Sequence, residues 1–261
     1  MFDIAVETAL LLALAAFFAG FMDAIAGGGG LVTVPALLLA GFGPVESIAT
    51  NKLQSIFGTA SSVIAYSAKG HVDLKAQIPW ACLSFIAGVG GALMASFLPG
   101  EFLEAILPVL LIGVAIFFAV RPRVDDIDRA RRISPFLFGI AIVPVIGFYD
   151  GAFGPGAGSF FMLAFVALAG FGILKATAHT KLLNFASNFG GFVAFAFLGV
   201  VYWKIGLLMG VAQFAGARLG AALAMKKGAA VIKPLLIVVC LALALRLLTQ
   251  EDNPLLTFLG F

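Results

Sequence analysis

The sequence predicts an all-α integral membrane protein built from two inverted repeats of about five membrane segments each. Three observations lead to this prediction: the composition, a series of long apolar runs, and a pattern that returns in the second half of the chain. Of the 261 residues, 62% are apolar and only 11% are charged. A soluble domain carries about 25% charged residues because water must wet its surface. We therefore expect the exterior of this chain to face lipid.

Apolar runs of about 20 residues, the length that crosses a bilayer, recur along the chain. The full-length candidates are residues 4–25, 45–68, 76–98, 102–120, 133–152, 174–198, 203–225 and 231–248. Two shorter runs, 31–42 and 159–171, follow glycine-rich breaks. At 1.5 Å per residue each would extend only about 18–20 Å. They are expected either to cross with tilt or local thinning of the bilayer, or to be half-helices that re-enter.

The two halves of the chain resemble each other. Residues 20–23 (GFMD) return 127 positions later as residues 147–150 (GFYD), and each copy is followed by a glycine-rich break. At a shift of 129, residues 49–53 (ATNKL) meet residues 178–182 (AHTKL). An ordered series at a nearly constant offset predicts a duplication. The predicted division is residues 1–120 for the first membrane repeat, 121–132 for a charged cytoplasmic loop, and 133–261 for the second repeat.

Loop charges predict the orientation of the repeats. With ten crossings and an outside amino terminus, most lysines and arginines fall in cytoplasmic loops, whereas Glu46, Glu101 and Glu104 fall outside; Lys204 is the exception. Five segments per half are an odd number, which inverts the second half, as in many secondary transporters. If the short segments re-entered, the halves would instead be parallel. We expect a multi-pass protein of a bacterial-type inner membrane with both termini in the periplasm.

Two lysines and two aspartates lie within or close to the predicted spans at equivalent positions of the halves. Charge in hydrocarbon costs at least about 2.5–3.5 kcal/mol, so each such group needs a reason. Lys52 and Lys181 each lie about 12 Å inside a helix, where the amine either reaches the nearer interface or contacts a bound anion. Asp23 and Asp150 precede the glycine breaks by one turn. They are expected to cap exposed amides or tether a lysine, with proton relay as the alternative.

The glycine-rich breaks are further candidates for anion binding. A helix that begins after a break directs the positive end of its dipole toward it, and glycines let an anion approach the N–H groups. The alternative is a packing hinge where two helices touch. The expected contributors are Gly28, Gly29, Gly30, Gly156 and Gly158.

Five other polar residues complete the candidate binding site. Asn51, Thr180 and Asn184 are expected to donate hydrogen bonds to the anion. His179 either titrates with transport or is a structural hydrogen-bonding residue. Arg218 either extends to the interface or contacts the anion.

Two copies of an acid, a glycine-rich break, a short apolar segment and an Ala-x-x-Lys helix resemble the TauE/SafE family of sulfite and organosulfonate exporters. Residues 216–220 (GARLG) are also similar to the late helix of that family. The resemblance covers essentially the whole chain. It implies a substrate among small sulfur-containing anions such as sulfite, sulfonates or sulfonated carboxylates.

The expected function is export of such an anion by alternating access around a central site, with proton coupling and uniport both open. The expected partners are the anion and membrane lipids, with a homo-oligomer left open. A net charge of +3 without a long basic run argues against nucleic acid. Two histidines and two scattered cysteines do not form an ordinary zinc site, so no metal or cofactor is expected. The alternative is a non-transporting membrane protein, either a scaffold or an embedded enzyme. An enzyme would need a reactive constellation that the sequence lacks.

Overall fold

The computed structural model describes residues 5–103, 106, 109 and 127–227, and every regular element in these ranges is helical. The first half supplies α1 (Val6–Ala26), α2 (Gly30–Leu39), α3 (Pro44–Ser67) and α4 (Leu74–Phe97). The second half supplies α6 (Pro135–Leu137), the π-helical turn η1 (Phe138–Ile142), α7 (Val143–Ala152), α8 (Ala157–Ala164), the π-helical turn η2 (Phe165–Ala169), α9 (Ile173–Phe197) and α10 (Trp203–Lys227). The predicted all-α class is confirmed.

Several of these helices suit a membrane. The helices α1, α4 and α10 and the continuous helical segment 135–152 are each long and apolar enough to cross a bilayer. The helices α3 and α9 are as long, with 24 and 25 residues, but each carries a buried polar face. The predicted span 231–248 and most of 102–120 lie outside the described residues.

The first glycine break explains why α1 ends where it does. Gly27 has φ of 72°, a left-handed conformation that favours glycine, and its N–H bonds to the carbonyl of Asp23. Gly156 takes a similar conformation, with φ of 80°, immediately before α8. Each break therefore closes one helix and begins a short one.

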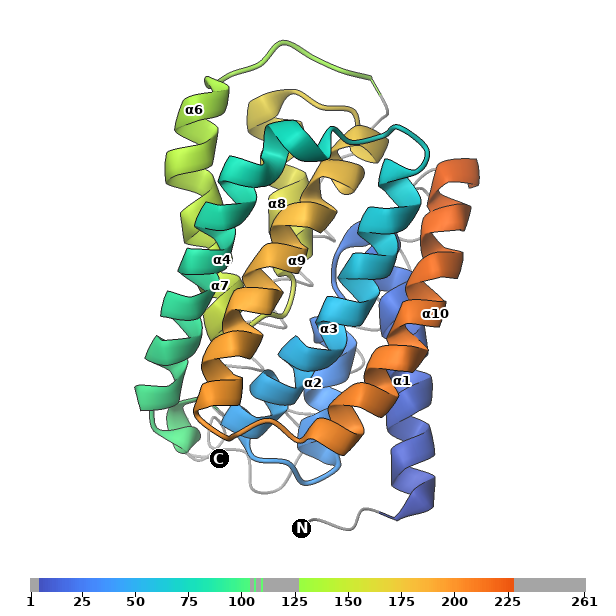
Figure 1. Ribbon diagram of the computed structural model, residues 1–261, viewed down its shortest axis with the longest axis vertical. Helices are drawn as coiled ribbons and strands as arrows, with labels where there is room; N and C mark the ends of the chain where they lie inside the picture. The colour runs from blue at the N-terminus through green and yellow to red at the C-terminus, as the bar shows by residue number, and fades with distance from the viewer. Residues whose placement is uncertain (1–4, 104–105, 107–108, 110–126, 228–261) are drawn as a thin grey trace.

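The helix α2 folds back along α1, and α8 folds back along α7 in the same way (Figure 1). Leu37, near the end of α2, and Phe42 pack in one apolar cluster with Leu12 of α1. In the second half, the N–H of Arg132 donates to the carbonyl of Leu168 over 2.9 Å, so the end of η2 lies beside the start of that half. Each pair therefore returns to the side from which it came, with its glycine break at the tip.

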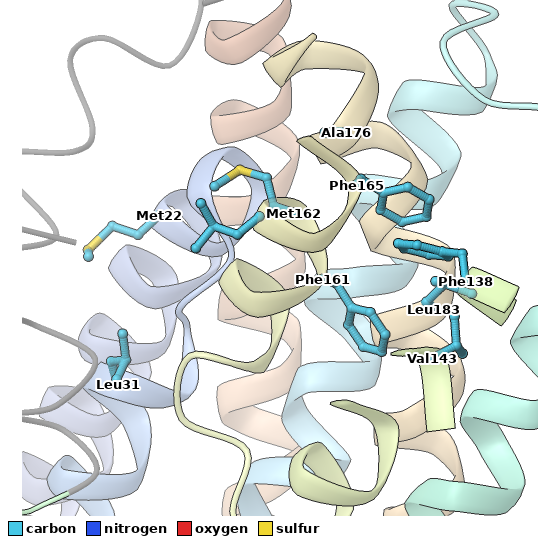
Figure 2. Packing of buried hydrophobic residues seen from close by; sticks show 10 residues of the cluster. Met22, Leu31, Phe138, Val143, Phe161, Met162, Phe165, Ala176 and Leu183 are labelled. Carbon is cyan, nitrogen blue, oxygen red and sulfur yellow. The ribbon is translucent and has the colours of Figure 1, made fainter. Parts of the chain in front are cut away.

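The two tips meet inside the molecule. A Cβ on Gly27 would overlap the backbone of Gly158, so this approach requires glycine. The hydroxyl of Ser159 donates to the carbonyl of Ala26 over 2.8 Å. Around the tips, apolar side chains from α1, α2, α8 and α9 form one cluster, part of which Figure 2 shows at Phe161 and Leu183.

The helices of the two halves are interleaved. The helix α10 packs along α1 and α3, and α4 packs along α7 and α9. Glycines make the close approaches: a Cβ on Gly216 would overlap the backbone of Phe17, and a Cβ on Gly91 that of Phe148. Small residues at such contacts let membrane helices pack backbone to backbone. Neither half forms a separate bundle, and α3 and α9 pack against each other at the centre.

Candidate functional site

The two buried lysines each pair with an aspartate of the other half. The Nζ of Lys52 lies 2.8 Å from Oδ1 of Asp150 and also donates to the Asp150 carbonyl. The Nζ of Lys181 lies 3.4 Å from Oδ2 of Asp23 and also donates to the Asp23 carbonyl. Both lysines are 0% exposed. In this structure the two ammonium groups therefore reach carboxylates rather than an interface.

The reason for these pairs lies in the helix registers. Pro44 begins α3, so Lys52 lies two turns inside that helix, at the level of Asp150 in the last turn of α7. When two opposite charges are buried together, their attraction offsets the cost of losing water only if the two groups are in close contact. Removing one partner of such a buried pair typically costs about 3–5 kcal/mol. Both pairs are thus expected to join the halves.

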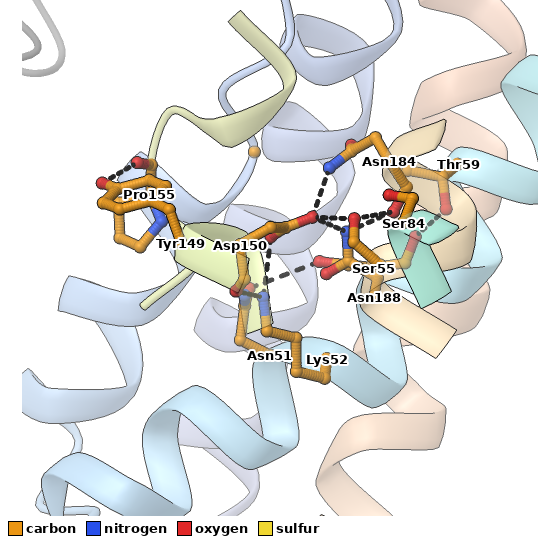
Figure 3. Close-up of polar contacts among 12 residues, drawn as sticks. Asn51, Lys52, Ser55, Thr59, Ser84, Tyr149, Asp150, Pro155, Asn184 and Asn188 are labelled. Carbon is orange, nitrogen blue, oxygen red and sulfur yellow. Dashed lines mark hydrogen bonds and ion pairs between the residues drawn. The ribbon is translucent and has the colours of Figure 1, made fainter. Parts of the chain in front are cut away.

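Asp150 is held by several donors besides Lys52. Its Oδ2 accepts hydrogen bonds from Nδ2 of Asn184 at 2.8 Å, from Nδ2 of Asn188 at 3.0 Å and from the hydroxyl of Ser187. Figure 3 shows Asn184 and Asn188 converging on the carboxylate from α9, with Lys52 approaching from α3. Together with Lys52, these donors hold the Asp150 carboxylate between α3 and α9.

Asp23 has a different set of partners. Its Oδ1 accepts the backbone N–H groups of Gly28 at 3.0 Å and Gly29 at 3.2 Å, which are the amides freed by the first break. Its other oxygen faces the longer, 3.4 Å contact with Lys181. Asp23 therefore caps the break and holds a lysine at the same time.

A small polar pocket lies between these groups and draws on both halves. Its lining residues are Asp23, Gly28, Gly29, Gly30, Asn51, Ser55, Thr59, Asp150, Gly154, Gly156, Ala157, Gly158, Asn184 and Asn188. About 10 Å³ of it is open to the centre of a water molecule, which is close to the least space that holds one water. A larger anion enters only if the surrounding groups move apart.

Most of the residues proposed from the sequence surround this pocket. The five glycines, both aspartates, Asn51 and Asn184 line it. Lys52 and Lys181 do not appear in its wall; each ammonium is bonded to the aspartate that does. Thr180 is buried, and its hydroxyl has no hydrogen-bond partner among the described residues.

Two candidates are not brought to the pocket. The Nδ1 of His179 lies 2.9 Å from the carbonyl of Lys175, and its ring packs against Phe165 and Phe171. Arg218 lies on the exposed face of α10. Any role of these two side chains in binding would need a different conformation.

Sequence reasoning missed several lining residues, and one pattern could have found them. Asn51, Ser55 and Thr59 follow one another at four-residue spacing on α3, which places them on one face. At the offset of 129, the same face of α9 carries Asn184 and Asn188. A comparison of the residues on this face of α3 with those on the equivalent face of α9 would have added Ser55, Thr59 and Asn188.

Long apolar helices around a buried, charged pocket that draws on both halves of the chain are typical of a multi-pass membrane protein of the transporter class. A family model described as "Sulfite exporter TauE/SafE" matches residues 12–247. The chain therefore belongs to the TauE/SafE family, as the sequence motifs predicted. Members of this family are membrane transporters rather than enzymes, which confirms the prediction that the chain is not an enzyme.

Named relatives agree with this class. A Sinorhizobium protein described as "Probable membrane transporter protein ORF9" is 55% identical over the full length of both chains. The Escherichia coli K12 protein described as "Probable membrane transporter protein YfcA" is 43% identical over 94% of this chain and 91% of its own. A "Probable membrane transporter protein" from Haemophilus influenzae is 38% identical over 95% of this chain and 98% of its own. No solved structure matches the chain.

Proposed function

We propose that the protein exports a small sulfur-containing anion, such as sulfite or an organosulfonate, by alternating access around the pocket between its halves. The observation that carries this proposal is the pocket itself, which combines both glycine breaks with two Lys–Asp pairs. The family description names sulfite, and the relatives are described only as membrane transporters. Sulfite and sulfonates share a compact group of negatively charged oxygens that suits ammonium and N–H donors.

The donors for this anion come from both halves. Lys52 and Lys181 would neutralise its charge, the breaks would supply backbone N–H groups, and Asn51, Thr180 and Asn184 would donate further hydrogen bonds. The first turn of α8 has N–H groups for which helix geometry supplies no acceptor within the helix. In the present conformation Asp23 and Asp150 engage the lysines, so the anion has to displace or weaken these pairs.

An inverted arrangement of the repeats would place the pocket midway between two access paths. Two observations support it. In Figure 1, α3 and α10 rise through the molecule, whereas their equivalents α9 and α4 descend. Tyr202, just after the end of α9, donates its backbone N–H to the hydroxyl of Thr50, near the start of α3. With the loop charges, an inverted arrangement would leave both termini in the periplasm of a cell with an inner membrane.

Transport into liposomes tests the proposal. The purified chain is reconstituted, and counterflow is measured for sulfite, small sulfonates, sulfate and simple carboxylates, with protein-free liposomes as the control. We expect saturable counterflow for sulfite or at least one sulfonate and little for the carboxylates. Counterflow of carboxylates alone, or of none of these anions, would overturn the proposed substrate class.

A further inference from the structure

The two Lys–Asp pairs are equivalent in sequence but differ in geometry. Asp150 is 1% exposed and receives side-chain donors from Asn184, Ser187 and Asn188 as well as a 2.8 Å contact with Lys52. Asp23 is 5% exposed and has only the longer contact with its lysine and two backbone amides. The Asp150 carboxylate is thus fixed between helices, whereas the Asp23 carboxylate is held by the weaker set of donors.

The partners of Asp23 are the groups that an incoming anion would use. They are the N–H groups of Gly28 and Gly29 at the start of α2 and the ammonium of Lys181. All three favour negative charge, and Asp23 already supplies it. The Asp23 carboxylate therefore engages three donors of the kind that suits a small anion.

A hydrogen-bond acceptor without a partner lies next to Asp23. Gln213 is 1% exposed, and its Oε1 has no partner within the described residues. A Cβ placed on Gly29 would lie 3.1 Å from Cβ of Asp23 and 3.3 Å from Nε2 of Gln213, so both side chains lie against the same face of that glycine. An ionised carboxylate can only accept hydrogen bonds, whereas a protonated one has an O–H to donate. A protonated Asp23 would bring an O–H donor to the side of Gly29 on which Gln213 also lies.

At the equivalent position beside Asp150, the chain carries no such side chain. Ser84 occupies the position equivalent to Gln213 at the offset of 129, and its hydroxyl donates to the carbonyl of Leu183 over 2.8 Å. The other groups around Asp23 are also accounted for. Lys181 is its titratable partner from α9, and Tyr66 from α3 donates its hydroxyl to the Ala24 carbonyl. The described parts of α2 and α8 contain no charged residue, and the charged residues of α10 are exposed.

Charge balance gives the last step. Among the described residues, two carboxylates and two ammonium groups meet around the pocket, and their formal charges sum to zero. A monovalent anion would leave one uncompensated negative charge away from water, which is costly. One proton taken up with the anion restores the balance.

We propose that Asp23 is a proton-binding residue: its carboxylate occupies the donors of the anion site, and protonation releases them, so that each monovalent anion binds together with one proton. This inference rests on the proposed anion site. Upon binding, Asp23 becomes a neutral acid, and the two amides and Lys181 turn to the anion. Such cotransport is electrically neutral. It exports the anion whenever the outward anion gradient exceeds the opposing proton gradient.

Calorimetric titration of the purified chain with methanesulfonate tests the linkage, because this anion stays ionised at every pH used. Titrations in two buffers of different ionisation enthalpy give the number of protons taken up per anion. We expect about one proton for the unmodified chain and about none for Asp23→Asn. We also expect affinity to fall with rising pH in the unmodified chain and to be nearly flat in the variant. Asp128→Asn, at an exposed loop, should behave as the unmodified chain. Anion binding without proton uptake would overturn the proposal.

Infrared spectroscopy of the chain without any anion provides the second test. Lowering the pH should produce the carbonyl band of a protonated carboxyl that is missing in Asp23→Asn. A band that is absent, or that survives in Asp23→Asn, would overturn the proton site even if methanesulfonate binds. If methanesulfonate does not bind while the band behaves as expected, the sulfonate substrate fails and the proton site stands.

Discussion

At the scale of single residues, the repeat predicted which side chains would be equivalent but not which would touch. Lys52 and Lys181 follow from the offset, as do Asp23 and Asp150. The offset relates positions within the two halves, however, and says nothing about contacts between them. The crossed pairing of each lysine with the aspartate of the other half therefore could not be read from the sequence. The burial of both ammonium groups depends on that pairing.

Neutralising either lysine should weaken binding of the transported anion. A charge-assisted hydrogen bond contributes about 1.5–3 kcal/mol, so Lys52→Met or Lys181→Met should lower affinity about tenfold to a hundredfold. Calorimetry on each variant measures this. Unchanged affinity in both variants would show that the lysines only hold the fold together.

A charge-neutral double variant separates stability from binding. Lys52→Met alone leaves Asp150 without its cation and should reduce the free energy of unfolding by about 3–5 kcal/mol. Adding Asp150→Asn removes the uncompensated charge and should recover most of this loss while leaving anion binding weak. Thermal unfolding in detergent, beside the calorimetry, checks both statements; recovery of binding in the double variant would contradict the direct role of Lys52.

At the scale of elements, the sequence predicted the short helices and the breaks, because glycine runs and length are local properties. It left open whether the short segments cross or re-enter. The structure places α2 back alongside α1, with the break at the tip of the pair. The expectation that re-entry would make the halves parallel assumed that the long helix crosses alone, whereas here the long and the short helix return together. The return of α2 along α1 could not be predicted, because it depends on the packing of Phe42 and Leu37 against Leu12, which is a tertiary contact. The tips also meet through Gly27 and Gly158, from opposite halves.

The glycine breaks can be tested by small substitutions that the backbone tolerates. Gly156 has a left-handed conformation, so a valine there would strain the fold whatever its effect on binding. A Cβ on Gly30, in contrast, would lie 3.4 Å from Pro155, an ordinary contact, and would enter the pocket wall. Gly30→Ala should therefore fold normally and reduce counterflow severalfold. Gly100→Ala, where no atom lies within 4 Å, is the matched control. Normal counterflow by Gly30→Ala would favour a packing hinge.

The start of α9 depends on pH through a loop outside the membrane. Oδ1 of Asp128 accepts the N–H of Gly172 at 2.7 Å, and Oδ2 lies 2.7 Å from Nζ of Lys175. The backbone N–H of Gly172 and then Lys175 lower the pKa of the Asp128 carboxyl. A lowered folded-state pKa means that this stabilisation is present above the ordinary carboxylate pKa of about 4 and is lost as pH falls through the lowered value.

Asp128→Asn should therefore destabilise the protein slightly at neutral pH. The pair is half exposed, so the effect should be well below 1 kcal/mol, or about 1–2 °C in the unfolding temperature. The difference between the variant and the unmodified chain should shrink near pH 3. Scanning calorimetry at both values checks this, and an equal difference at the two values would contradict it.

At the scale of the whole molecule, composition and periodicity were sufficient for the class, since an apolar exterior leaves few alternatives to a helical membrane protein. They were not sufficient for the interleaving. The helix α10 contacts α1, and α4 contacts α7. In each contact, a helix from the early part of one half packs against a helix from the late part of the other half. Only the spacing of small residues such as Gly216 and Gly91 hints at these contacts.

Cysteine labelling tests the orientation of the whole chain. In a background without Cys82 and Cys240, single cysteines replace Asp3, Ile127 or Leu255, and a membrane-impermeant reagent is applied to intact cells. We expect labelling at the two ends of the chain and protection at Ile127. A protected position 255 together with a labelled position 3 would contradict the inverted arrangement.

The crossed ion pairs also constrain how the protein can be made. Asp23 leaves the ribosome 158 residues before Lys181, an interval of about 10–30 s at ordinary rates of synthesis. For most of that time Asp23 and Lys52 both lack the partner they have in the finished fold, because Asp150 follows Lys52 by 98 residues. The newly inserted first half therefore stays incompletely packed in the bilayer: its charges are unpaired, and α10 is not yet present to pack against α1. A chain that stops within the central loop should be recognised and degraded by membrane quality control. The first half can complete its ion pairs and its packing only after α9 and α10 have been synthesised.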